Sequence, residues 1–158
     1  NTADRLDASY VGEDGQRHPP VMIHRALLGS LERFIGILIE HFAGSFPLWM
    51  SPTQIVLTGI SEAQNEAVEA VRAKFFDAGF RVATDLRNEK VNLKIREHSL
   101  KKVPFIGVIG GREAENGTIT IRRFGAPKQT TLPVDDLIAA MQEEVATRSL
   151  PPNFSTEQ

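Results

Sequence analysis

The chain of 158 residues contains no cysteine. Disulfide bonds and thiolate metal sites are therefore excluded, and a reducing compartment is favoured. No apolar run approaches the roughly 20 residues that a membrane-spanning helix needs, and the N-terminus lacks a secretory pattern. These absences predict a soluble, cytoplasmic protein without a membrane partner.

The sequence motifs of several common catalytic sites are also missing. The histidines, at positions 18, 24, 41 and 98, show neither H-x-x-x-H nor H-E-x-x-H spacing, and there is no nucleophile elbow. The stretch GVIGGRE fits neither the dinucleotide-binding nor the P-loop pattern. From the residues alone, a single histidine such as His24 is more often a structural group than a metal ligand.

Charge is present but unevenly distributed. The net charge is −2 over a chain with 41% hydrophobic and 24% charged residues, values that predict a packed core. Residues 87–128 contain ten Lys or Arg against four Glu, a net +6, whereas the remainder contains eight basic and sixteen acidic residues, a net −8. A charge run is often only a solvated surface, but this asymmetry favours an anionic polymer as partner.

The first 45 residues predict two strands and a helix. The strands flank the turn GEDGQ at 12–16, and the second strand is expected at 20–23. An apolar stripe at helical spacing predicts a helix over 24–44, ending at Gly44. Two prolines then make 46–52 a linker.

From residue 53 onward, strand and helix patterns alternate. Ser61 and Gln64 can form a capping box at the start of the first helix. The stretch REAENG at 112–117 reads as a turn, with Asn116-Gly117 as a hairpin signal. The order β-α-β-α-β-β-α predicts an α/β fold with an open, mixed, mainly parallel sheet flanked by helices. The expected strands are 54–60, 81–86, 104–110 and 118–124, the helices 61–78, 91–102 and 133–149, and the flexible tail 150–158.

The charged pair Glu32-Arg33 interrupts the apolar stripe of the expected 24–44 helix. Burying such a pair is costly unless each charge has a partner. Two interpretations are open, an internal ion pair or an arginine held where it meets a phosphate or a flat base. Arginine suits the second task because its planar guanidinium forks to oxygens and stacks.

These residues lead to a resemblance. HRALLGSLERFIGILIEH resembles the third signature motif of class II aminoacyl-tRNA synthetases, which carries Gly-x-x-Glu-Arg. With PVMIHRALLGSLERF and DLRNEKVNLKIREHSLKKVPF, the resemblance is to the threonyl-tRNA synthetase family and spans about residues 10–149. It implies the end of a catalytic domain at 1–45 and an anticodon-binding domain at 53–149. The implied activity is ATP-dependent ligation of threonine to tRNA(Thr) through a threonyl-adenylate.

The resemblance assigns roles to four residues of the first segment. His24 matches one of three zinc ligands, and the other two, a Cys and a His, belong to sequence upstream of this chain. Arg33 matches the arginine that contacts ATP, Glu32 orients it or contributes to the catalytic site, and Ser30 lies where the family lines its threonine pocket.

The first and second class II motifs are absent from the chain, so it is expected to be a C-terminal part that is not catalytic alone. The resemblance implies ATP with magnesium and one zinc in the full-length enzyme, and no cofactor bound to this segment by itself. It also implies a homodimeric full-length enzyme, whereas the segment is expected to be a monomer.

The same resemblance explains the basic segment as the surface that receives the anticodon stem-loop. Asn88, Glu113 and Arg122 match the family's base-reading residues, and an amide, a carboxylate and a guanidinium can read the shared middle guanine and third uracil of threonine anticodons. Lys90, Arg96 and Lys101 are candidate phosphate contacts. For Lys90 and Arg96, a solvated helix face is the open alternative.

A second function remains open. The chain could be a free-standing, anticodon-binding-like module that binds RNA or serves as an accessory protein without catalysis. An upstream reading frame carrying the missing Cys and His ligands would distinguish the ligase from this module.

Overall fold

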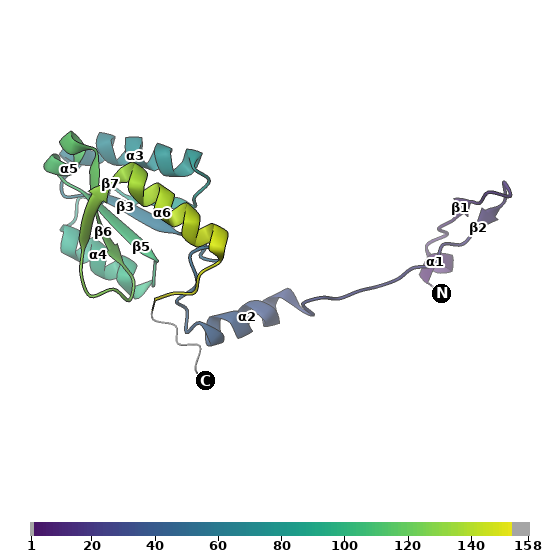
Figure 1. Ribbon diagram of the computed structural model, residues 1–158. Coiled ribbons are helices and arrows are strands. Elements are labelled where there is room, and N and C mark those ends of the chain that lie inside the picture. The colour runs from purple at the N-terminus through teal and green to yellow at the C-terminus, as the bar shows by residue number, and fades with distance from the viewer. Residues whose placement is uncertain (1, 153–158) are drawn as a thin grey trace. The chain divides into compact units, whose positions relative to one another are not determined.

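The computed structural model describes residues 2–152, which divide into two compact units between Gly36 and Ile37 (Figure 1). The division expected from the sequence, with 1–45, a linker at 46–52 and a domain at 53–149, stays a prediction. Of the expected tail at 150–158, residues 153–158 lie outside the described residues.

The first unit begins with a short helix and a two-stranded sheet, α1 (Thr2–Arg5), β1 (Tyr10–Val11) and β2 (Arg17–His18). The strands pair antiparallel across the predicted turn, with Tyr10 opposite His18. The position expected for the second strand, 20–23, is wrong, because this stretch adopts no regular structure. Pro19 and Pro20 have no N–H group and cannot continue the ladder.

Helix α2 (Leu31–His41) begins seven residues later than the sequence pattern predicts. Gly29 has φ +66°, a left-handed conformation that cannot enter a right-handed helix, and Ser30 follows as the first capping residue. The Phe34 N–H donates to the Ser30 carbonyl at 3.0 Å. Glu32 and Arg33 lie exposed in the first turn, so the interpretation of this pair as an internal ion pair is wrong, and the functional interpretation of Arg33 stays a prediction.

The second unit is built on one five-stranded sheet with the order β4-β3-β5-β6-β7. Strand β3 pairs parallel with β4 and β5, whereas β5–β6 and β6–β7 are antiparallel. The predicted α/β class with an open mixed sheet is confirmed, although there are as many antiparallel as parallel pairings. The strands are β3 (Ile55–Gly59), β4 (Val82–Asp85), β5 (Phe105–Ile109), β6 (Thr118–Arg123) and β7 (Thr130–Pro133).

Two elements of this unit differ from the sequence prediction. The expected turn at 112–117 is largely a helix, α5 (Gly111–Asn116), and Gly117 ends it at φ +65° instead of forming a hairpin. The Glu113 carboxylate accepts the Gly110 N–H at 3.1 Å and so caps the helix. Strand β7 was not expected, because this edge strand is short and mostly exposed and ends in a proline.

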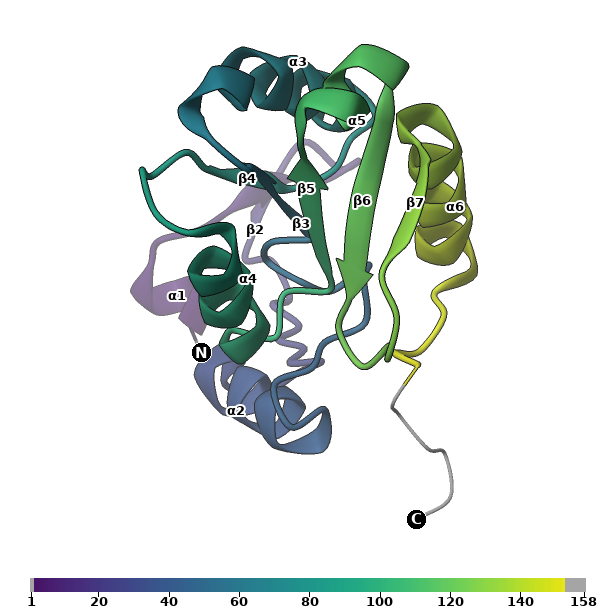
Figure 2. The same cartoon turned by 90° about the vertical axis from the view of Figure 1, so that its left-hand side faces the viewer.

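The helices cover the sheet on both sides (Figures 1 and 2). A short 3-10 helix (Glu62–Gln64) with the predicted capping box leads into α3 (Asn65–Asp77), which packs with α6 (Val134–Thr147) on one face. Helix α4 (Val91–Leu100) lies on the other. The main buried core comprises Leu48, Ile55, Leu57, Val68, Phe75, Phe80, Phe105, Ile109, Ile119, Val134, Leu137 and Met141.

Gly107 in the central strand β5 leaves no room for a side chain. A Cβ there would lie 2.5 Å from Ile119 Cδ1 and 2.8 Å from Leu57 Cδ2. We expect Gly107→Ala to lower the free energy of unfolding by about 1–3 kcal/mol through overpacking, as measured by urea denaturation. Gly111→Ala is the control, since no atom lies within 4 Å of its added Cβ. Equal stability of the two variants would contradict the expectation.

Candidate nucleic-acid interface

Helix α4 presents two different sides to its surroundings. Lys94, Glu97 and His98, spaced three or four residues apart, lie on the side that meets the end of β4. Asn92, Arg96 and Ser99 lie on the side that faces β6 and the loop before β7. One helix thus anchors itself to the sheet and also forms the wall of a groove.

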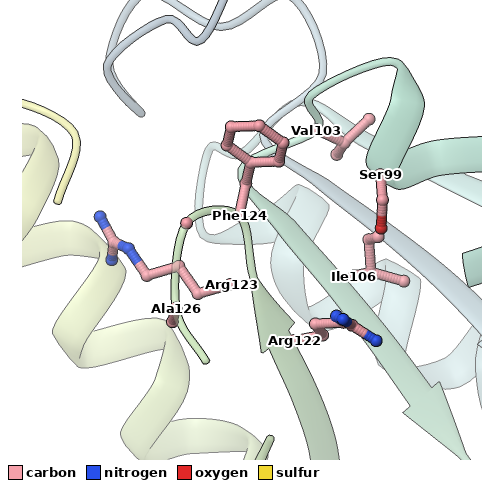
Figure 3. Close-up of a pocket in the computed structure, with 8 residues that line it drawn as sticks. Ser99, Val103, Ile106, Arg122, Arg123, Phe124 and Ala126 are labelled. Carbon is pink, nitrogen blue, oxygen red and sulfur yellow. The ribbon is translucent and has the colours of Figure 1, made fainter. Parts of the chain in front are cut away.

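The groove consists of two adjoining hollows between α4 and the β6–β7 hairpin, and we call it the α4–β6 groove. One hollow has a volume of about 340 Å³ and the other about 160 Å³, and both are lined by Ser99 and Arg122. Figure 3 shows the smaller hollow, with apolar walls from Ile106 and Phe124. The remaining lining residues of the pair are Asn92, Ile95, Arg96, Val103, Arg123, Gly125, Ala126 and Gln129.

Two adjacent arginines of β6 point in different directions (Figure 3). Arg123 turns toward α6, where Nη1 and Nη2 donate to the Glu144 carboxylate at 2.5 and 2.6 Å, and its guanidinium lies 4.8 Å from the Phe105 ring centre. Arg122 pairs in register with Ile106 and faces the α4–β6 groove, where no described residue forms an ion pair with it. Its five N–H donors are therefore available to a ligand.

The positive segment 87–128 contains fewer available charges than its count suggests. Arg87, Lys94, Lys102 and Arg123 each bond to another part of the chain. Lys94 is also buried, so this basic side chain of the positive segment is not available to a partner. Within residues 2–152, the basic side chains of this segment without a hydrogen bond or ion pair are Lys90, Arg96, Lys101, Arg112, Arg122 and Lys128. All three predicted phosphate contacts, Lys90, Arg96 and Lys101, belong to this exposed group.

Asn88 lies exposed in the loop that follows β4. The Glu89 N–H donates to the Arg87 carbonyl at 2.9 Å, so Asn88 occupies the centre of a tight turn. This loop leaves the edge strand of the sheet at the same end where α4 begins.

Glu113 is held beside β6 by its hydrogen bonds. The Thr120 hydroxyl donates to Oε1 at 2.9 Å, and Oε2 accepts the Gly110 N–H. The backbone N–H of Glu113 itself, followed by the Thr120 hydroxyl, lowers the pKa of this carboxyl below its ordinary value. The group therefore stays an ionised acceptor at neutral pH.

The structure brings two of the three predicted base readers close together. Thr120, which holds Glu113, and Arg122 are two residues apart on one face of β6, about 7 Å along the strand. Asn88 follows Asp85, which aligns across the sheet with Thr120 three strands away, at about 14 Å. The three side chains form an extended surface and not a single pocket.

The groove is also lined by Asn92, Ser99 and Gln129, which were not predicted from the sequence. The spacing of Asn92, Arg96 and Ser99 along the basic helix could have indicated a shared polar side. Gln129 could not be placed without strand β7, whose pairing with β6 brings it to the groove.

The predicted residues of the first unit lie in two places. His24 is exposed in a segment without regular structure. Ser30, Glu32 and Arg33 come together at the start of α2, where the Ser30 hydroxyl donates to Glu32 Oε2 at 2.8 Å. The backbone N–H of Glu32, followed by that hydroxyl, lowers the pKa of its carboxyl.

His24 by itself does not fit a zinc site. In residues 2–152, no three His, Asp or Glu side chains form a group that could hold a metal ion, whereas a catalytic zinc needs three protein ligands. No described helix is long and apolar enough to span a membrane.

Comparison with known proteins assigns the second unit. A family model described as an anticodon binding domain matches residues 54–144. The chain belongs to the anticodon-binding domain family. This domain contains Asn88, Glu113, Arg122 and the α4–β6 groove, whereas His24 and Arg33 precede it.

Curated relatives of this anticodon-binding domain protein are named threonine–tRNA ligase. The one from Parvibaculum lavamentivorans is 57% identical over 141 residues, which are 89% of this chain and 22% of the relative. That from Magnetococcus marinus is 49% identical over 158 residues, 100% of this chain and 24% of the relative. The chain thus spans about a quarter or less of the length of these relatives. They confirm the resemblance to threonyl-tRNA synthetases.

Solved structures share the anticodon-binding domain fold. The RNA binding domain of threonyl-tRNA synthetase from Cryptosporidium parvum Iowa II is 34% identical, with a TM-score of 0.70, over 90% of this chain and 36% of that one. Prolyl-tRNA synthetase from Cryptosporidium parvum, at 17% identity and a TM-score of 0.64, covers 93% of this chain and 32% of that one and supports the fold alone.

Proposed function

We propose that this chain binds and reads the anticodon loop of a threonine tRNA as part of a threonine–tRNA ligase. The names of its relatives and the RNA binding domain among the similar structures support this proposal. The observation that carries it is the α4–β6 groove, where Arg96 and Arg122 lack ion-pair partners among the described residues and stand on the positively charged segment.

The available side chains divide by chemistry. Lys90, Arg96 and Lys101 would neutralise phosphates, which gives affinity with little base information. Arg122 would donate its fork to a base edge, and the ionised Glu113 would accept from guanine. Unpaired bases of a loop can be splayed out, which suits readers spread over an extended surface.

The activity of the whole ligase belongs to the same proposal. It would join threonine to tRNA(Thr) in the cytoplasm, as a homodimer, with ATP, magnesium and one zinc. Arg33 with Glu32 would contact ATP, and Ser30 would line the threonine pocket. His24 would need two further protein ligands before it could hold zinc.

Titration of a labelled threonine anticodon stem-loop at two salt concentrations tests the reading function. We expect binding that weakens with salt and that falls when the middle guanine or third uracil is replaced. Arg96→Ala should weaken cognate and base-swapped loops alike and flatten the slope of log K against log salt by about 0.7–0.9. A wild-type chain that binds all loops equally would contradict the proposal.

A further inference from the structure

A buried carboxylate lies directly below the loop that carries Asn88. Asp85 ends β4 with its side chain only 4% exposed. Oδ1 accepts Arg87 Nε at 2.9 Å, and Oδ2 accepts Arg87 Nη2 at 2.7 Å and bonds His98 Nε2 at 2.9 Å. The Asp85 carbonyl accepts the Thr58 hydroxyl at 2.8 Å. The Asp85 carbonyl is thus bonded to β3, and the Asp85 carboxylate is bonded to α4.

Helix α4 completes the network from its anchoring side. Lys94 Nζ donates to the Asp85 carbonyl at 3.3 Å, and Glu97 Oε2 accepts Arg87 Nη2 at 2.6 Å. The two carboxylates balance the charges of Arg87 and Lys94, so the cluster adds little positive potential for a polyanion. The cluster connects the end of β4 to α4, which indicates a structural role.

Arg87 is committed to this cluster through three groups. Its guanidinium bridges Asp85 and Glu97, its N–H approaches Asp85 Oδ1 at 3.3 Å, and its carbonyl accepts the Glu89 N–H. The hydrogen bonds that Arg87 donates to Asp85, and then to Glu97, hold the pKa of Arg87 above its ordinary value. The residues on both sides of Asn88 are therefore tied down, while Asn88 itself is exposed.

We infer that Arg87 is a positioning residue that holds Asn88 for base reading without touching the RNA. This inference rests on the proposed function, because the selectivity it concerns is that for the anticodon loop. It gives Arg87 no phosphate contact, although Arg87 lies within the most basic stretch of the chain. We call the contacts of Arg87 with Asp85 and Glu97 the clamp. The clamp affects selectivity between loops, whereas Arg96, which has no ion-pair partner among the described residues, affects affinity for every loop.

The test compares Arg87→Gln with Arg72→Gln. Arg72 also forms an ion pair, with Glu69 at 2.5 Å, but on α3 at the opposite face of the sheet. We expect Arg87→Gln to lower the ratio of cognate to base-swapped affinity by about fivefold, because Arg87 and Asn88 belong to one coupled network. The salt slope should stay unchanged, because Arg87 makes no phosphate contact. Arg72→Gln should change neither quantity. Unchanged selectivity with a flatter salt slope would overturn the inference, because Arg87 would then be a phosphate contact.

A double variant tests whether Arg87 acts through Asn88. In an Asn88→Ala background, Arg87→Gln should cause no further loss of selectivity. A full additional loss there, or an Asn88→Ala variant with wild-type selectivity, would overturn the inference.

The free protein gives a second readout that needs no RNA. Arg87→Gln should accelerate hydrogen exchange at the Glu89 amide, which the Arg87 carbonyl holds. An unchanged exchange rate would overturn the clamp even if RNA binding is confirmed. A wild-type chain that binds no stem-loop would overturn the proposed function and the reading role with it, and the exchange rate would still decide whether the clamp exists.

Discussion

Asp85→Ala should lower the free energy of unfolding by about 1–3 kcal/mol, the range found when buried donors lose their hydrogen-bond acceptor. Asp85 is buried and its carboxylate accepts hydrogen bonds from Arg87, so its loss leaves the half-exposed Arg87 and the partly buried His98 without their carboxylate. Urea denaturation at neutral pH measures this loss. Asp135→Ala is the matched control, because its ion pair with Lys74 is exposed and contributes at most about 1 kcal/mol.

The same variant should change how stability depends on pH. Arg87, then His98, donate hydrogen bonds that hold the pKa of Asp85 well below its ordinary value. A depressed carboxyl pKa stabilises the fold above the unfolded pKa of about 3.9, and this stabilisation is lost as the pH falls toward the folded pKa. The wild-type chain should therefore lose stability below about pH 4 more steeply than Asp85→Ala. Parallel profiles for the two proteins would show that Asp85 is not the responsible group.

Arg122→Ala should affect RNA binding and Arg123→Ala should affect stability, although the two residues are neighbours. Arg122→Ala should weaken binding of the threonine anticodon stem-loop and reduce discrimination against base-swapped loops by about 1–3 kcal/mol, since it removes the donor fork of the α4–β6 groove. It should leave the unfolding free energy nearly unchanged. Arg123→Ala should instead cost about 3 kcal/mol of stability, because Glu144, with a side chain 13% exposed, loses its bidentate partner.

Both variants are measured by loop titration and by urea denaturation under one set of conditions. Arg123→Ala should keep the wild-type preference for the cognate loop at temperatures where it is folded. If Arg122→Ala lowers cognate and base-swapped affinities equally, Arg122 contacts the backbone and the assignment of the reading surface fails. If Arg123→Ala alone loses base discrimination, the two roles have been exchanged.

Local sequence patterns predicted most helices and strands of the second unit, because capping residues and the spacing of apolar residues act over a few neighbouring positions. The predicted capping box at Ser61 and Gln64 lies where the short helix before α3 begins, and Val68 and Phe75 lie buried on one face of α3. Strand β7 was missed because an edge strand buries little and its exposed threonines leave no clear apolar alternation. Helix α2 was predicted too long because the apolar spacing continues through Gly29. The left-handed backbone of Gly29 cannot belong to a right-handed helix, so α2 begins after it.

The amino-acid pattern alone predicts the order of elements apart from α5 and β7, the positive segment and the resemblance that names Asn88, Glu113 and Arg122. It could not determine which charges are available to a partner. Arg122 and Arg123 are identical in type and adjacent in sequence, and only the register of β6 against β5 directs one to the groove and the other to Glu144. The pairing partners lie far along the chain, so availability is decided by contacts between distant segments, and these exist only in the folded protein.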